Sequence, residues 1–110
     1  MKKIIAFDFD GTLALTDYPV ILAPRTAVIE YAKRCKKAGH TIILYTCREG
    51  EPLKAAVEFC KANGLEFDYV NENTVEKVKE YGESRKIYAD FYFDDHARPP
   101  EFIEDVMEKG

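Results

Sequence analysis

Cysteine is scarce and unpaired in this chain, and tryptophan is absent. The three cysteines are an odd number and form no C-x-x-C pair, so the sequence indicates neither a disulfide framework nor a zinc site. Cys35 and Cys60 fall on the apolar stripes of two expected helices, where a buried thiol is the ordinary outcome. This use of cysteine predicts a reducing, cytoplasmic location.

An excess of positive charge and long hydrophobic runs are also lacking. The 20 acidic residues outnumber the 16 lysines and arginines, and the net charge of −4 argues against general nucleic-acid binding, which needs a basic face. No apolar stretch approaches the roughly 18 residues of a membrane span. Acids interrupt the first apolar run within a few residues, which is typical of a strand rather than of a signal peptide. We therefore expect no membrane partner.

What the chain does contain is an alternation of strand and helix signals. Its 110 residues, 46% apolar and 33% charged, predict one globular domain over residues 1–110. Apolar stretches predict strands at residues 3–9, 41–46, 66–70 and 91–93. Spacing and capping predict a helix that Pro24 opens and Gly39 ends, a second from about Leu53 to Gly64, a short third capped by Thr74, and a last one opened by Pro99 or Pro100.

This alternation predicts an α/β fold with a parallel sheet of about four strands and helices on both faces. In such sheets ligands bind at the carboxyl ends of the strands. The first predicted strand ends at Asp8 and Asp10, the second at Thr46, and the fourth at Asp94 and Asp95. We therefore expect these side chains to share one edge of the sheet.

The residue types at this edge favour a magnesium ion and a phosphate. Carboxylates gathered there would repel one another unless a cation lies among them, and hard oxygen ligands favour Mg²⁺. Lys86, before the last strand, offers a positive charge for phosphoryl oxygens, as does its neighbour Arg85. The Thr46 hydroxyl could bind the same oxygens. Arg48 could fork onto a substrate anion or form a surface salt bridge.

Together these motifs resemble the haloacid dehalogenase (HAD) superfamily of phosphotransferases. "DFDGTL" at residues 8–13, Thr46 at a strand end, Lys86 and the acid pair at 94–95 occur in that family's order, and the resemblance runs from about Lys3 to His96. It implies a Rossmann-like three-layer sandwich with strand order 3-2-1-4. It also implies a Mg²⁺-dependent phosphatase that hydrolyses a small phosphomonoester.

The resemblance assigns a role to each matching residue. Asp8 would be the nucleophile that forms an aspartyl-phosphate, and Asp10 would protonate the leaving oxygen and then activate water. Asp8, the main-chain carbonyl of Asp10 and Asp94 would hold Mg²⁺, with Asp95 coordinating it directly or through water. The phosphate-binding residues would be Thr46 and Lys86. A single carboxylate cannot be esterified and also carry the proton, so the chemistry itself calls for two acids.

No cap domain fits this chain, because only about a dozen residues separate the first motif from the helix expected at Pro24. Capless members of the superfamily act on large substrates or are closed by a neighbouring subunit, so a homo-oligomer that covers the site is one expectation. Residues 12–23 predict an apolar connection without helical or strand periodicity. This segment is open to three interpretations: a lid, an oligomer contact, or packing onto its own domain.

Two functions of other classes remain as alternatives. A phosphoacceptor switch would use similar residues, but it would place the accepting aspartate after the third strand, where this chain has no acid. A phosphate-binding protein that acts through a partner is the other alternative. Among the remaining polar residues, His96, Asn71 and Asn73 follow strand ends and are candidates for substrate contact, whereas His40 and Asp90 belong to the opposite edge.

Overall fold

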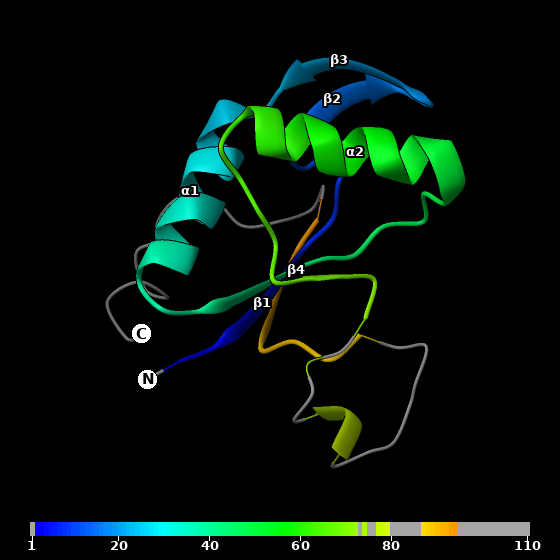
Figure 1. Ribbon diagram of the computed structural model, residues 1–110. Helices are drawn as coiled ribbons and strands as arrows, with labels where there is room; N and C mark the ends of the chain where they lie inside the picture. The colour runs from blue at the N-terminus through cyan, green and yellow to red at the C-terminus, as the bar shows by residue number, and fades with distance from the viewer. Residues whose placement is uncertain (1, 73, 75–76, 80–86, 95–110) are drawn as a thin grey trace.

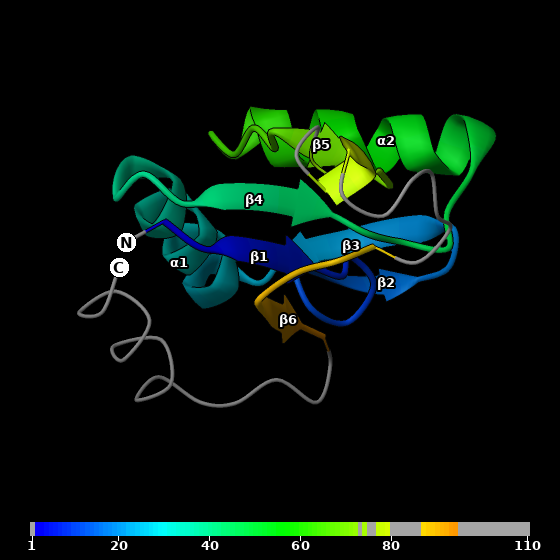
Figure 2. The same cartoon turned by 90° about the horizontal axis from the view of Figure 1, so that it is seen from below.

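The computed structural model describes residues 2–72, 74, 77–79 and 87–94 (Figure 1). Its main sheet has four strands, β1 (Ile4–Phe7), β4 (Thr41–Leu44), β5 (Tyr69–Val70) and β6 (Phe91–Phe93). Their order is β5-β4-β1-β6, and every neighbouring pair is parallel. Figure 2 shows β4 and β1 side by side and running in the same direction. The α/β fold with a parallel sheet is therefore confirmed.

Two helices cover one face of this sheet, α1 (Thr26–Lys37) and α2 (Gly50–Ala62). In both views they lie on the same side of the sheet (Figures 1 and 2). The expected stops are confirmed, because Gly39 and Gly64 adopt φ values of +96° and +82°, which a residue with a Cβ rarely adopts. The second helix begins earlier than predicted, at Gly50, so that Pro52 lies in its first turn.

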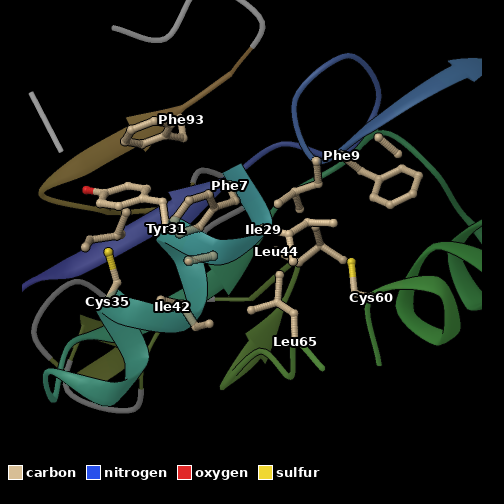
Figure 3. Close-up of a cluster of buried hydrophobic side chains, with 14 of the residues drawn as sticks. Phe7, Phe9, Ile29, Tyr31, Cys35, Ile42, Leu44, Cys60, Leu65 and Phe93 are labelled. Atoms are coloured by element: carbon tan, nitrogen blue, oxygen red, sulfur yellow. The ribbon is translucent and has the colours of Figure 1, made fainter. Parts of the chain in front are cut away.

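The core lies between these helices and the sheet (Figure 3). The Phe7 ring stacks on Phe93 at a centroid distance of 5.4 Å, and Tyr31 of α1 approaches Phe93 at 4.8 Å. Phe7 and Tyr31 have no exposed surface, and burying one such ring stabilises the fold by about 2 kcal/mol. Cys35 and Cys60 are buried in the same cluster, as the sequence predicts. This core fixes the strand ends on which the candidate site is built.

The segment after the first motif is a β-hairpin, which corrects the prediction of a connection without structure. Its strands β2 (Ala14–Asp17) and β3 (Val20–Pro24) pair antiparallel, and the Tyr18–Pro19 bond at its tip is cis. Pro24 ends β3 instead of opening a helix, because it pairs with Ala14. The hairpin lies on the same side of the sheet as α2 (Figure 1).

The two faces of this hairpin differ in exposure. Leu13 and Ala14 are buried and Ile21 packs against the core, so one face is part of the domain. The other face is exposed and apolar, with Leu15, Tyr18, Val20 and Leu22 each more than half exposed. Packing onto its own domain is therefore confirmed for one face only.

The opposite face of the sheet carries a smaller apolar cluster built on Ala6, Ile43 and Ala89. Thr74 begins a short helical stretch on this side, as predicted, since its Oγ1 accepts a hydrogen bond from Lys77 N–H at 3.3 Å (Figure 1). The predicted helix after Pro99 or Pro100 lies outside the described residues. In the part of the chain that the structure describes, no helix has both the length and the apolar character that crossing a bilayer requires.

Candidate active site

The strands of the main sheet end side by side. The hydrogen bonds between neighbouring strands continue for one residue beyond the end of β1, β4 and β5. The backbone N–H groups of Asp8, Tyr45 and Asn71 donate to the final carbonyl of the neighbouring strand at 2.8, 2.9 and 2.7 Å. Asp94 follows Phe93, the residue paired with Phe7, and so continues the same register. Because paired residues of parallel strands point to the same face, Asn71, Tyr45, Asp8 and Asp94 form one row, which we call the carboxyl-edge row.

Asp8 and Asp94 are neighbours in this row, at the place where the sequence predicts a magnesium site. Both are oxygen ligands of the kind Mg²⁺ prefers, and adjacent strands place them about 5 Å apart at the backbone. Phe9 N–H donates to Asp8 Oδ1 at 2.7 Å, which fixes the orientation of that carboxylate. Within the described ranges no three His, Cys, Asp or Glu side chains are grouped to hold a metal ion. Asp95, the predicted third acid, and Lys86 lie outside those ranges.

Asp10 lies on a tight turn that follows β1. The carbonyl of Phe9 accepts hydrogen bonds from the backbone N–H groups of residues 12, 13 and 14, so the chain reverses immediately after β1. Gly11 has φ of +79°, a conformation that explains the glycine of "DFDGTL". The turn delivers the chain into the hairpin and places the Asp10 carboxylate beside β2.

The Asp10 carboxylate is bound by Arg48 in a two-pronged ion pair. Arg48 Nε donates to Oδ2 at 2.9 Å, and Nη2 donates to Oδ1 at 2.7 Å. Thr16 Oγ1 adds a third hydrogen bond, to Oδ1, at 2.8 Å. Such a planar fork is the strongest common form of carboxylate recognition. Asp10 therefore lies in an organised site rather than at a solvated strand end.

Arg48 is itself enclosed, which alters its expected role. Its side chain is 1% exposed, and Nη1 donates to the carbonyls of Pro19 and Pro52, each at 3.2 Å. The guanidinium carbon lies 4.9 Å from the Phe9 ring centroid and 5.0 Å from that of Tyr18. Here Arg48 forks onto Asp10 instead of onto a substrate anion, and the ion pair is buried rather than at the surface. Its predicted phosphate-binding role does not fit this arrangement.

This pairing shifts the protonation equilibria of both groups. The hydrogen bonds from Arg48 are the main reason that the pKa of Asp10 lies below its ordinary value, and Thr16 adds to the effect against the opposing cost of burial. The pKa of Arg48 is raised, chiefly by its hydrogen bonds with Asp10. The structure therefore stabilises Asp10 as a carboxylate, the form that accepts a proton.

Thr46 lies one residue beyond Tyr45 and is fixed by two backbone contacts. Its N–H donates to Asn71 Oδ1 at 2.8 Å, and its Oγ1 accepts a hydrogen bond from Arg48 N–H at 3.2 Å. Asn71 has φ of +54°, a left-handed conformation that asparagine tolerates better than most residues. Asn71 thus positions Thr46, whereas Asn73 and His96 lie outside the described residues.

A cavity of about 450 Å³ opens beside Asp8. We call it the Asp8 cavity; it is lined by Asp8, Tyr45, Thr46, Cys47, Asn71, Ile87 and Tyr92. Three members of the carboxyl-edge row contribute to its wall, so the cavity lies on the face of the sheet that α1 and α2 leave uncovered. Asp10 and Arg48 are not among its lining residues.

The residues assigned to the opposite edge are found there. Asp90 Oδ2 accepts a hydrogen bond from Ile4 N–H at 2.7 Å, at the start of β1. His40 is 3% exposed, and its Nδ1 accepts a hydrogen bond from Lys3 N–H at 3.0 Å. Both residues therefore stabilise the amino edge of the sheet.

Sequence reasoning misses three residues of this region. Thr16 binds Asp10 only because of the hairpin, for which the sequence gives no clear signal. Tyr45 and Tyr92 line the Asp8 cavity, with ring centroids 5.8 Å apart and ring planes at 89°. Their positions follow from strand register, since Tyr92 pairs with Ala6 and Tyr45 follows Leu44, the partner of Phe7. Register is the signal that could have identified them.

Comparison with solved structures places the chain among known proteins. Its fold is similar to that of a conserved protein coded by a locus of Bacteroides thetaiotaomicron, with a TM-score of 0.85 and 36% sequence identity over 100% of this chain and 93% of the other. The chain belongs to the family of that protein. No protein-family model matches the chain, and a search of curated proteins gives no match. The Bacteroides relative is described only as a conserved protein. The comparison therefore establishes the fold, and the function has to be inferred from the site.

Proposed function

We propose that this protein is a Mg²⁺-dependent phosphatase of the HAD superfamily that hydrolyses a phosphomonoester through an aspartyl-phosphate on Asp8. The observation that carries the proposal is the difference in surroundings between the two acids of "DFDGTL". Asp8 faces an open cavity beside Asp94, whereas Asp10 is held by Arg48 and Thr16. The order β5-β4-β1-β6, with helical residues on both sides of the sheet, supports a three-layer sandwich of strand order 3-2-1-4.

Magnesium would be held by the Asp8 carboxylate, the Asp10 main-chain carbonyl and Asp94, with Asp95 as a further ligand. The donor set fits, because all these groups are hard oxygens and two of them are adjacent in the carboxyl-edge row. When bound, the ion supplies positive charge that allows a phosphate dianion to approach an anionic carboxylate.

In the first half of the reaction, the Asp8 carboxylate attacks phosphorus and forms a new bond to it. The bond from phosphorus to the leaving oxygen breaks, and Asp10 gives that oxygen a proton. To do so, Asp10 must be protonated and must release at least one of its hydrogen bonds with Arg48. The Thr46 hydroxyl and Lys86 bind the transferring phosphoryl oxygens.

In the second half, water attacks phosphorus and the bond to Asp8 breaks, which releases inorganic phosphate. Asp10 accepts the proton that the water gives up. The ionised form of Asp10 that Arg48 and Thr16 stabilise is the form this step needs. The alternative of a phosphoacceptor switch is not favoured, because the residue that follows β5 is Asn71 and not an acid.

Phosphate release from p-nitrophenyl phosphate tests the proposal directly. We expect turnover with Mg²⁺, none with EDTA, and a loss of at least about 10⁴-fold in Asp8→Asn, because an amide is neither a nucleophile nor a good magnesium ligand. Glu58→Gln is the matched control, since Glu58 is an exposed acid of α2 outside the site. Turnover that survives Asp8→Asn would contradict the proposal, and labelling of the unaltered protein without turnover would favour the switch.

A further inference from the structure

The Asp8 cavity holds more space than a phosphoryl group needs. Its volume of about 450 Å³ lies in the range of pockets that enclose small organic ligands. Asp8 and Thr46, the groups expected to contact the phosphoryl group, form only part of its wall. The remaining wall leaves room for a group attached to the phosphate.

The described wall of this cavity is poor in charge. Apart from Asp8, its residues are two tyrosines, an isoleucine, a cysteine, a threonine and an asparagine. The side-chain oxygens of the amide and the threonine each accept one backbone hydrogen bond, Asn71 Oδ1 from Thr46 N–H and Thr46 Oγ1 from Arg48 N–H. Tyr45, Tyr92, Ile87 and Cys47 give the described wall surface against which an apolar group can be buried.

Two aromatic rings shape the wall instead. Tyr45 and Tyr92 meet edge to face at 5.8 Å, and Tyr92 is 44% exposed. The Tyr92 hydroxyl donates to the Ile87 carbonyl and accepts a hydrogen bond from Ala89 N–H, so the ring is fixed. A fixed, perpendicular pair of rings offers both an edge and a face to a third ring.

We propose that the substrate is a small phosphomonoester whose leaving group carries a planar apolar ring close to phosphorus, and that Tyr45 and Tyr92 select it. This inference rests on the proposed function and names the class of substrate that the same site takes.

Three substrates that all release a primary alcohol test this selection: benzyl phosphate, ethyl phosphate and glucose 6-phosphate. Their reacting bonds are chemically alike, so differences in kcat/KM report recognition of the leaving group. We expect benzyl phosphate to exceed each of the other two by about 10-fold or more. Equal values, or a higher value for glucose 6-phosphate, would overturn the inference while leaving the phosphatase intact. No hydrolysis of any of the three, nor of p-nitrophenyl phosphate, would overturn the proposed function and this inference with it.

Variants then locate the preference. Tyr45→Leu and Tyr92→Leu should each lower the ratio of kcat/KM for benzyl phosphate to that for ethyl phosphate by about 3-fold to 10-fold. This is the size of effect expected from losing one contact between two aromatic rings. Tyr69→Leu removes a ring from the same face of the sheet outside the cavity wall and should leave the ratio unchanged. Cys47→Trp narrows the cavity from an exposed position and should lower kcat/KM for benzyl phosphate more than for ethyl phosphate.

The rate with ethyl phosphate shows whether each variant retains a working site. A benzyl preference that persists in both leucine variants would overturn the assignment to the rings. If the leucine variants fold poorly, Cys47→Trp decides, because an unchanged benzyl preference in that variant would show that the ring binds elsewhere.

Discussion

Asp8 and Asp10 lie two residues apart in the sequence but in different surroundings. Asp10 is held by protein groups: both of its oxygens accept hydrogen bonds from Arg48, and the hairpin adds one from Thr16. Asp8 borders a cavity and stands in a row of strand-end residues beside Asp94. The turn from Phe9 to Ala14 places Asp10 beside Thr16 and Arg48, whereas Asp8 continues the ladder of the main sheet. This difference in surroundings is what the two chemical roles proposed for the motif require.

Of the variants that distinguish the surroundings of Asp8 from those of Asp10, Asp10→Asn should change turnover most. An amide cannot carry the proton, so we predict an aspartyl-phosphate on Asp8 that forms slowly and persists, with turnover at least about 10²-fold lower. Acid quenching followed by intact-mass measurement would show one added phosphoryl group. A variant that turns over normally would show that Asp10 does not carry the proton.

Removing Arg48 should affect stability next most strongly. Arg48→Met keeps an apolar side chain near Phe9 but leaves the Asp10 carboxylate and the carbonyls of Pro19 and Pro52 without their donor. Because the Asp10 side chain is 32% exposed, we predict a loss of about 2–3 kcal/mol in the free energy of unfolding, at or below the lower end of the range for fully buried pairs.

Urea denaturation measures this loss, and Arg34→Met, at an exposed position of α1, is the matched control. The control should stay within about 0.5 kcal/mol of the unaltered protein. Equal losses in the two variants would show that the Asp10–Arg48 pair adds no specific stability.

A smaller effect should follow from the hairpin contact to Asp10. Thr16→Val keeps the β-branched shape but removes the hydroxyl, so we expect a loss of about 1 kcal/mol. Thr16→Ser retains the hydroxyl and should recover most of the stability in the same urea titration. If serine proves no better than valine, the hydrogen bond seen at 2.8 Å does not contribute.

The smallest expected effect is the pH dependence of stability that His40 causes at the amino edge of the sheet, away from the candidate site. Burial lowers the pKa of His40 below its ordinary value of 6.5. At a pH between the lowered pKa and 6.5, the unfolded chain therefore binds more protons than the folded one. The free energy of unfolding should therefore fall as the pH drops below about 6.5. His40→Asn, whose Oδ1 can accept the Lys3 N–H bond, should show a shallower fall in thermal unfolding between pH 7 and 5. An unchanged slope would assign the acid sensitivity to other groups.

The sheet could be predicted from the sequence because its strands are apolar runs that end at polar residues. The hairpin could not, because β3 alternates in exposure but not in polarity: Val20 and Leu22 are exposed and apolar, whereas Ile21 packs inward. Burial alternates from one residue to the next along β3, but apolar and polar residue types do not, so the sequence carries no strand signal there. The helix predicted to open at Pro24 is present, but it begins at Thr26, since that proline belongs to the hairpin.

The candidate site was predictable where it depends on strand ends and not where it depends on contacts between distant residues. Asp8, Thr46 and Asp94 follow strands, so their common edge follows from topology. Arg48 binds Asp10 across 38 positions of sequence. Arginine is rarely buried unless it is paired, and only the folded structure reveals the partner.

The central claim is that Asp8, and not Asp10, bonds to phosphorus beside a magnesium ion. A crystal structure with Mg²⁺ and beryllium fluoride, a mimic of the phosphoryl group, tests it most directly. The account predicts beryllium bonded to an Asp8 oxygen, magnesium between Asp8 and Asp94, and fluoride atoms in the Asp8 cavity. Beryllium bonded to Asp10, or Asp8 and Asp94 turned to different sides of the sheet edge, would contradict it.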